Sequence, residues 1–248
     1  KMSDEFMEEY VQNEIDLIED AIRAEKQDRG NRIVKELARA KKAWEAKLAK
    51  LSGKAKKDDL LSFEDLGIDW LFIDEAHLFK NLWRFTKMTR VAGLPNSNSE
   101  RAFDMFVKTR YIMEGHRGRA GVVFATGTPV SNSMAEMWVM QRYLQPKTLD
   151  AFQVGMFDTW AGNFGESVTA LELAPDGSGY RMQTRFARFV NLPELMSMFG
   201  EVADIRTAEM LDLPVPKAHK ETVTAKPTPE LRGYVQTLVE RAEDIRNG

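Results

Sequence analysis

The first 60 residues carry apolar side chains at the spacing of an α-helix. One stripe, with intervals of four and three residues, consists of Met7, Val11, Ile15, Ile18 and Ile22. A second stripe consists of Ile33, Leu37, Ala40, Trp44, Leu48 and Leu51. Each stripe lies on one face of a helix, and the glycine-containing break at residues 28–31 separates the two. The pattern predicts an antiparallel helical hairpin over residues 1–60, whose lysine-rich end at residues 52–60 is expected to be an exposed link.

The next part of the chain alternates short apolar runs with helical patterns. Residues 71–74 and 122–125 have the composition of buried strands, and polar residues follow each of them. Ser99 is a suitable N-cap for a helix that runs to about residue 114. Another helix is predicted over residues 131–144. This alternation predicts an α/β lobe over residues 61–210.

Residues 148–164 are predicted to form short helices rich in aromatic side chains. The aromatic residues in and before this stretch that we expect in the core are Trp138, Tyr143, Phe152, Phe157, Trp160 and Phe164. Residues 167–173 and 180–189 alternate roughly by two around the sequence Pro-Asp-Gly-Ser-Gly. That arrangement predicts a β-hairpin.

The last part of the chain, residues 211–248, is expected to begin as an extended linker, because it has prolines at positions 214 and 216. A helix is predicted just before it, over residues 193–203. Residues 221–225 are compatible with a strand. Thr228 followed by Pro229 predicts the start of a final helix, because proline fits the first helical position.

Composition narrows the class of protein without naming a function. The chain has 248 residues, of which 43% are hydrophobic and 29% charged, and its net charge is −3. It has no cysteine, which excludes disulfides and thiolate metal sites and fits a cytoplasmic location. No apolar run is long enough for a bilayer, so we expect no membrane partner. Both ends interrupt a pattern, so we expect the chain to be a piece of a longer protein.

The tetrapeptide Asp-Glu-Ala-His at residues 74–77 ends the first buried strand. A carboxylate at a strand tip can hold Mg²⁺, and a second one can orient or deprotonate the water that attacks ATP. Side chains alternate along a strand, so Glu75 can do this only if the backbone turns there. An ordinary strand end that happens to be acidic is the alternative reading of this tetrapeptide.

The sequence Thr-Gly-Thr-Pro at residues 126–129 ends the second buried strand. Its hydroxyl groups could hydrogen-bond His77, Gly127 would let the backbone pass closely, and Pro129 would fix the turn into the next helix. The alternative is a simple strand-to-helix turn with Thr128 or Ser131 as a cap. If both motifs form one site, the acids and the threonines should lie side by side on one edge of a sheet.

Together these motifs resemble the Swi/Snf-like branch of the superfamily-two helicases. Residues 74–81 are similar to motif II of that branch, and residues 126–132 are similar to its motif III. Residues 63–67, 142–146 and 184–189 also resemble the helicase part of large methylase–helicase proteins of phages and plasmids. The resemblance implies a partial RecA-like P-loop NTPase lobe, with the helical hairpin as an insertion before motif II and a helical and β-hairpin extension after motif III.

The resemblance also implies roles for individual residues. Asp74 would bind Mg²⁺, and Glu75 would be the catalytic base of ATP hydrolysis. His77 would belong to the same catalytic group, and Asp74 and Glu75 would form part of the binding site for Mg²⁺ and ATP. The residues implied to couple the ATP site to DNA are His77, Thr126, Gly127 and Thr128. The implied partners are double-stranded DNA, the missing N-terminal part of this lobe and a second lobe. Residues 211–248 would be the linker and the start of that second lobe.

Two parts of such a motor are missing from the sequence. There is no Gly-x-x-x-x-Gly-Lys-[Ser/Thr] loop to hold the phosphates of ATP, and the arginine motif of the second lobe is absent. The basic loop at residues 116–121 lies before motif III, so it does not replace that motif. Arg117, Arg119 and Lys80 are candidates for DNA contact, with a solvated turn as the alternative for the arginines. For the lysines of residues 35–57, which alternate with acids, we expect a solvated helix face rather than phosphate contacts.

The sequence therefore predicts the motif II and motif III segment of an ATP-dependent DNA helicase or translocase. Without the phosphate-binding loop, this segment should hydrolyse ATP negligibly by itself. A non-catalytic module that binds DNA or protein and retains relic ATPase motifs is the alternative. A DEAH-containing nucleotidase without a nucleic-acid substrate fits the acids but not their pairing with residues 126–129.

Overall fold

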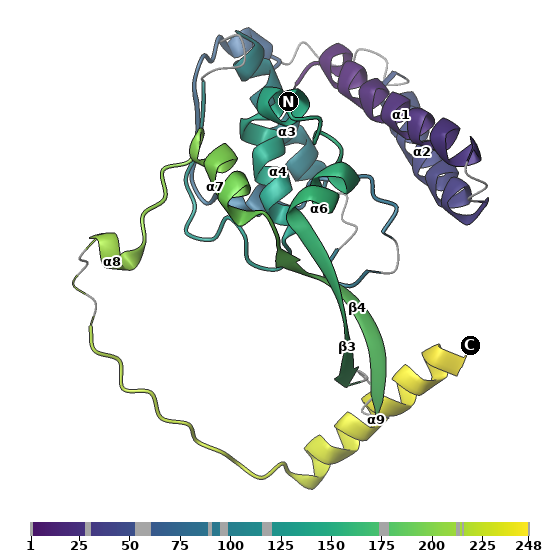
Figure 1. The fold of residues 1–248 in the computed structure, drawn as a ribbon, viewed down its shortest axis with the longest axis vertical. Helices are drawn as coiled ribbons and strands as arrows, with labels where there is room; N and C mark the ends of the chain where they lie inside the picture. Colours follow the sequence, from purple (N-terminus) through teal and green to yellow (C-terminus); the bar gives the residue numbers. More distant parts are fainter. Residues whose placement is uncertain are drawn as a thin grey trace.

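The computed structural model describes residues 2–27, 31–52, 61–88, 91–94, 99–115, 121–173, 179–211, 214 and 216–247. They form a body of helices with a short parallel sheet at its surface. An antiparallel β-hairpin projects from this body (Figure 1). An extended segment carries the last helix away from this body. No helix in the described part of the chain is both long and apolar enough to cross a membrane.

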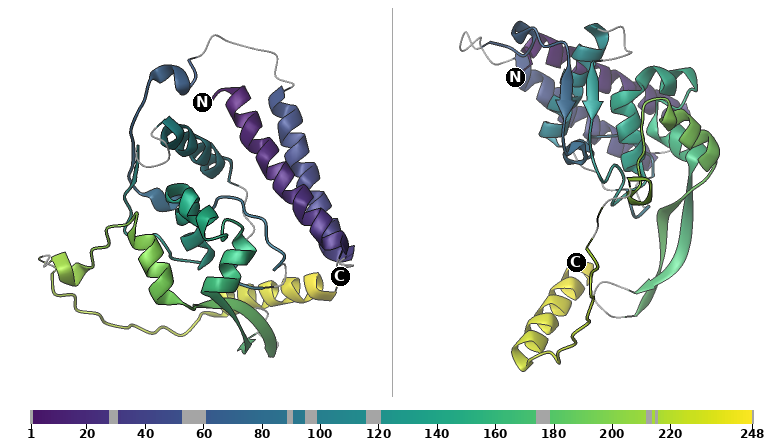
Figure 2. Two further views of the ribbon diagram at one scale, coloured as in Figure 1. Left: turned by 45° about the horizontal axis from the view of Figure 1, so that its top comes forward. Right: turned by 90° about the vertical axis from the view of Figure 1, so that its left-hand side faces the viewer.

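The predicted helical hairpin is confirmed. Helices α1 (Asp4–Gln27) and α2 (Asn31–Ser52) lie side by side (Figures 1 and 2). Their apolar stripes face inward, and Val11, Ile18 and Leu37 are essentially fully buried. The break at residues 28–30 and the link at residues 53–60 lie outside the described residues.

Aromatic side chains join this hairpin to the rest of the body. The Trp44 ring lies 5.1 Å from that of Trp83 and 5.3 Å from that of Phe103, measured between centroids. An ion pair between Arg142 and Glu14 adds a second, buried connection. One continuous hydrophobic cluster therefore includes the hairpin and the α/β part of the chain.

The two predicted buried strands form a parallel pair. Strand β1 (Leu71–Ile73) pairs with β2 (Val122–Phe124), with Ile73 opposite Phe124, and both arrows are visible in the right view of Figure 2. Helix α3 (Glu100–Gly115) connects them. The hydroxyl oxygen of Ser99 accepts a hydrogen bond from the backbone N–H of Ala102 at 3.2 Å, which confirms Ser99 as its N-cap.

Only one face of this small sheet is covered by the described residues. Ile73 points into the core and is 7% exposed, whereas Phe72 on the opposite face is 72% exposed. Trp70 stacks on Phe72, and Val123 is exposed beside them. Parallel sheets are normally buried on both faces, so this apolar face is unusual.

The helices that follow β2 form the centre of the core. They are α4 (Ala135–Leu144), α5 (Pro146–Ala151) and α6 (Phe157–Phe164). The aromatic residues predicted to be buried are so, with one exception: Phe152 follows the end of α5 and is 62% exposed. The helix predicted from about residue 131 is present but begins at Ala135, because residues 131–134 form a turn.

The predicted β-hairpin is confirmed as β3 (Gly165–Leu173) and β4 (Tyr180–Phe189), with a bulge between Glu166 and Ser167. Ala92 adds a short parallel bridge to the base of β4. The helix predicted over residues 193–203 is α7 (Leu192–Gly200).

The C-terminal part contains no strand among its described residues, so the expectation for residues 221–225 is wrong. These residues are exposed and have no strand beside them. A short helix that the sequence did not suggest, α8 (Ala208–Leu211), precedes them. The last helix, α9 (Pro229–Asn247), begins as predicted, since the Thr228 hydroxyl oxygen accepts a hydrogen bond from the N–H of Leu231 at 3.3 Å.

Candidate functional site

The tips of β1 and β2 lie next to each other at one edge of the sheet. The N–H of Ala125 donates to the carbonyl of Ile73 at 2.8 Å, and the N–H of Ala76 donates to the carbonyl of Ala125 at 3.0 Å. The hydrogen-bond ladder thus continues past both strands, into the two motifs that follow them. The predicted juxtaposition of residues 74–77 with residues 126–129 is confirmed.

The two adjacent carboxylates are brought to the same edge by a left-handed backbone. Glu75 has φ 53° and ψ 45°, which is unusual for a residue other than glycine. The backbone N–H of Glu75 donates to the Asp74 carboxylate at 2.9 Å, and both side chains are exposed. The sequence required a turn at this position for Glu75 to act beside Asp74, and the structure has one. Strained backbone of this kind clusters at functional sites.

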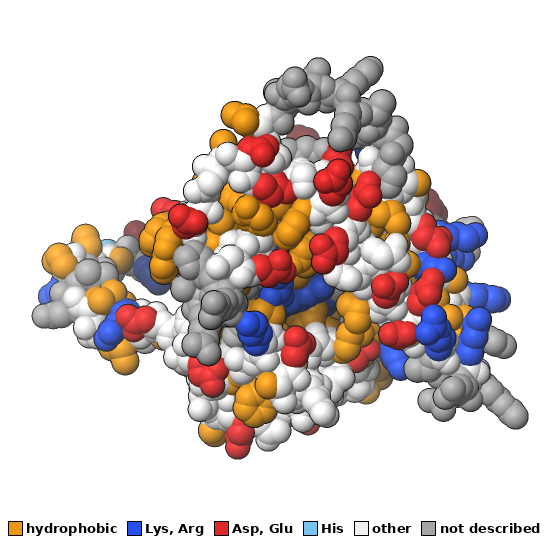
Figure 3. Space-filling model, turned by 90° about the horizontal axis from the view of Figure 1, so that it is seen from above, with side chains coloured by type: hydrophobic (Ala, Val, Ile, Leu, Met, Phe, Trp, Pro, Cys, Tyr) orange, Lys and Arg blue, Asp and Glu red, His pale blue; other side chains and the backbone are white. Residues whose placement is uncertain are grey.

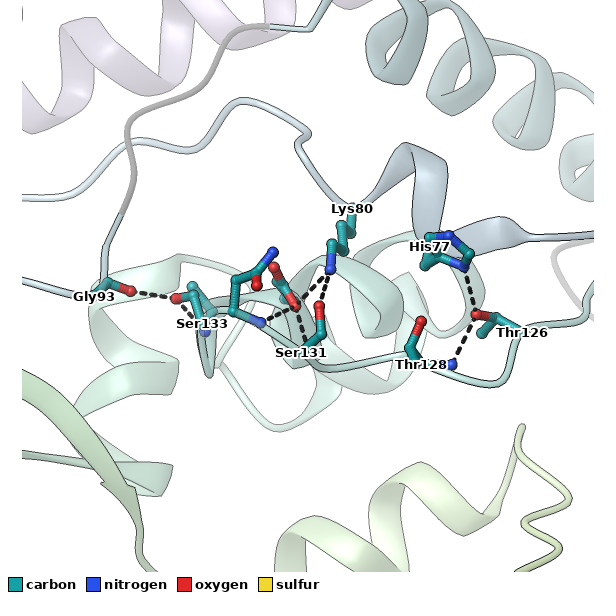
Figure 4. A network of polar contacts seen from close by, with 10 residues as sticks. His77, Lys80, Gly93, Thr126, Thr128, Ser131 and Ser133 are labelled. Atoms are coloured by element: carbon teal, nitrogen blue, oxygen red, sulfur yellow. Dashed lines mark hydrogen bonds and ion pairs between the residues drawn. The ribbon is translucent and has the colours of Figure 1, made fainter. Parts of the chain in front are cut away.

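His77 links the acids to the threonines. Its Nδ1 lies 3.1 Å from the hydroxyl oxygen of Thr126 (Figure 4). The same nitrogen lies 3.0 Å from a carboxylate oxygen of Glu75. Because a carboxylate only accepts hydrogen bonds, contact with Glu75 requires the proton on Nδ1. The Thr126 hydroxyl oxygen also accepts from the backbone N–H of Thr128 at 3.1 Å. A chain of polar contacts therefore runs from motif II into motif III.

Gly127 does not make the close backbone approach that we expected. A Cβ atom added to Gly127 would meet no described atom within 4 Å, and its φ is not in the left-handed region. Thr128 next to it is exposed. Within the described part of the chain, nothing restricts this position to glycine.

The structure describes only one of the three residues that were predicted to contact DNA. Arg117 and Arg119 lie outside the described residues, so their contact with DNA stays a prediction. Lys80 is 9% exposed, and its ammonium lies 3.2 Å from a carboxylate oxygen of Glu136 and in contact with the hydroxyl of Ser131. This burial argues against a direct contact between Lys80 and a phosphate.

Sequence reasoning missed Glu136, which lies in the first turn of α4. Its carboxylate accepts hydrogen bonds from the backbone N–H groups of Ser131 at 2.7 Å and Asn132 at 3.2 Å (Figure 4). These contacts hold residues 131–134 as a turn and delay the helix to Ala135. Ser133-x-x-Glu136 has the spacing of a capping box, although the structure has Met134 at the N-cap and Glu136 reaches back to Ser131 and Asn132 instead.

Tyr143 supports the second half of motif II. It is fully buried in α4, and its hydroxyl lies 2.7 Å from the carbonyl of Ala102 and 3.2 Å from that of Phe79. Phe79 ends η2 (Ala76–Phe79), the short 3₁₀-helix that contains His77. Burial raises the pKa of Tyr143, so the hydroxyl stays protonated and remains a donor.

The carboxylates of Asp74 and Glu75 are suited to a cation that also binds phosphate oxygens of a ligand. The described residues contain no group of three or more His, Asp or Glu side chains that could hold a metal ion. Mg²⁺ commonly binds through one or two carboxylates together with water and phosphate oxygens. Asp74, exposed at the strand tip, offers a hard oxygen ligand of this type.

The charged surface of the helical hairpin is mixed rather than basic. Figure 3 shows Lys and Arg side chains interspersed with Asp and Glu over α1 and α2, at the right of the view. Lys41 is typical, since its ammonium lies 2.8 Å from Glu19 and 3.1 Å from Glu45. For these described residues, a solvated face is the better interpretation.

Comparisons with known proteins complete this picture. A family model described as a probable helicase domain matches residues 1–207. The chain is 29% identical over 199 residues to Defense against restriction protein B of Escherichia phage P1. That alignment covers 77% of this chain and 9% of the phage protein, so the chain spans less than a tenth of that relative. No solved structure matches the chain.

Proposed function

The chain belongs to the probable helicase domain family, and from this premise we propose that it is the motif II and motif III segment of an ATP-dependent DNA helicase or translocase. In this proposal the segment is part of a RecA-like ATPase lobe. Its partners are double-stranded DNA, the remainder of that lobe and a second lobe. The observation that carries the proposal is the contact between His77 and Thr126 across the tips of two parallel strands.

The residues at these tips have chemistry suited to ATP hydrolysis. Asp74 would hold Mg²⁺, which would neutralise charge on the phosphates of ATP. Glu75 is turned toward the same edge of the sheet, where its carboxylate can accept a proton from an attacking water. His77 contacts both Glu75 and Thr126. A movement of either side chain can therefore shift the His77 ring and, through it, the other side chain.

The exposed apolar face of the parallel sheet supports the proposal that the lobe is completed by other segments. Trp70, Phe72 and Val123 would be covered if further strands and helices extended this sheet. The missing phosphate-binding loop would belong to such a segment. The chain of residues 1–248 by itself is therefore expected to hydrolyse ATP negligibly.

The test is ATP hydrolysis by the full-length protein, with and without double-stranded DNA. We expect DNA to stimulate turnover, and Glu75→Gln to abolish it because the amide cannot accept the proton. Glu194→Gln is the matched control, since it makes the same change at an exposed carboxylate on α7. Wild-type protein with no turnover, or turnover that survives Glu75→Gln, would favour the non-catalytic interaction module instead.

A further inference from the structure

A buried ion pair connects the end of motif II with the helix after motif III. Lys80 directly follows η2, and Glu136 lies in the first turn of α4. Their side chains are 9% and 6% exposed, and the Lys80 ammonium lies 3.2 Å from the Glu136 carboxylate. Neither residue touches the carboxylates at the strand tip in any hydrogen bond or ion pair described above, so a direct part in chemistry is not indicated.

The pair does more than neutralise two charges. The Glu136 carboxylate also accepts the backbone N–H groups of Ser131 and Asn132, and the Lys80 ammonium also donates to the Ser131 hydroxyl. Burying a carboxylate is costly unless it is paired and hydrogen-bonded. Here the hydrogen bonds are made to one short turn, so the position of that turn is fixed by the charge pair.

The turn at residues 131–134 begins within motif III, because Ser131 and Asn132 are the last residues of that motif. Thr126 contacts His77 at one end of the motif, and Ser131 contacts Lys80 at the other. His77 and Lys80 are separated only by residues of η2. The two segments are thus held together at two points along their length (Figure 4). Beyond the second point, the Ser133 hydroxyl donates to the carbonyl of Gly93 and anchors the turn to a third segment.

We propose that Lys80 and Glu136 are positioning residues, which hold the motif III loop so that Thr126 stays in contact with His77. This inference rests on the proposed function for its consequence, which is transmission between the ATP site and DNA. The claim that the ion pair holds the motif III loop in place does not depend on that function. Removal of the pair should loosen the loop and disturb the environment of the His77 ring.

The experiment compares two double variants that each remove a buried ion pair. Lys80→Met with Glu136→Gln removes the proposed clamp. Arg142→Met with Glu14→Gln is the matched control, because it removes a buried pair between α4 and α1 whose side chains are 14% and 7% exposed. Double variants are used because a single change would leave one buried charge without its partner. Equal losses of thermal stability in the two would show that they are well matched.

The first readout is the ¹⁵N NMR signal of the His77 ring in the chain of residues 1–248, which has three histidines. We expect it to shift in the clamp variant and to remain in place in the control. The second readout is DNA-stimulated ATP turnover of the full-length protein. We expect stimulation to fall at least about fivefold in the clamp variant, the lower range of coupling between two sites, and to persist in the control.

The two readouts separate this inference from the proposed function. If wild-type full-length protein shows no DNA-stimulated turnover, the proposed function fails, and the His77 signal still decides whether the clamp exists. An unshifted His77 signal in the clamp variant overturns the inference. So does a loss of stimulation that is the same in both double variants, because a general loss of stability would then explain it.

Discussion

Gly165, where α6 gives way to β3, offers a sharp test of the packing at the base of the β-hairpin. A Cβ atom at this position would lie 1.9 Å from Cζ and 2.1 Å from Cε2 of Phe186. Phe186 is 4% exposed, and its ring packs edge-on against that of Phe157 at a centroid distance of 6.1 Å. The backbone of Gly165 is extended, with φ −134°, so alanine is conformationally allowed there. The cost of Gly165→Ala is therefore steric.

The magnitude depends on whether the Phe186 ring shifts or leaves the core. Overpacking that a core absorbs by small shifts costs about 1–3 kcal/mol. Loss of a buried phenylalanine from its site costs about 3–5 kcal/mol. An overlap this deep cannot be relieved by a few tenths of an ångström, so we expect a loss of about 3 kcal/mol. For a chain of this size, that lowers the melting temperature by roughly 6–12 °C.

The assay is urea unfolding followed by circular dichroism, with the midpoint compared at constant slope. Gly162→Ala is the matched control, because a Cβ atom there meets no described atom within 4 Å and the residue lies inside α6. That control should be neutral or stabilising by up to about 1 kcal/mol. Adding Phe186→Leu to Gly165→Ala should recover part of the loss. A Gly165→Ala protein as stable as wild type would refute the packing described for the hairpin base.

Other consequences can be measured separately. Thr126→Val removes the hydroxyl that contacts His77. DNA stimulation of ATP turnover should therefore fall, while the free energy of unfolding changes by only about 1 kcal/mol. Unchanged stimulation would contradict the coupling role of Thr126. Trp44→Ala should cost about 3–5 kcal/mol in urea unfolding, since this ring joins the helical hairpin to the body; a cost near zero would mean that the contact is not made. Arg185 holds the pKa of Glu172 below its usual value through a hydrogen bond. The stability that this pair adds to the β-hairpin is present above the ordinary carboxyl pKa and is lost as the pH falls through the lowered pKa of Glu172. NMR titration of the β3 and β4 amides should show this pH dependence. The variant Arg185→Ala should abolish it.

Local patterns in the sequence were sufficient for most elements of the fold. The helical hairpin, the two buried strands, the β-hairpin and the capped helices at Ser99 and Thr228 all follow from spacing and capping within a few residues. The placement of both motifs on one edge of the sheet also followed, because two short parallel strands present their carboxyl ends together. The capping-box spacing of Ser133 and Glu136 marked the start of α4 only approximately, because Glu136 binds the N–H groups of Ser131 and Asn132 instead.

Contacts between distant segments were beyond the reach of such patterns. Burial of Lys80 depends on a carboxylate that comes from another element, and nothing in the residues beside Lys80 distinguishes a buried ammonium from one that faces a phosphate. The exposure of Phe152 and the absence of a strand at residues 221–225 have the same cause, since burial and strand pairing require a partner that the local sequence does not specify. The sequence by itself determined which groups reach the edge of the sheet. Only the tertiary structure decided how they are held there, because the left-handed turn at Glu75 and the buried Lys80–Glu136 pair depend on the packing of the whole body.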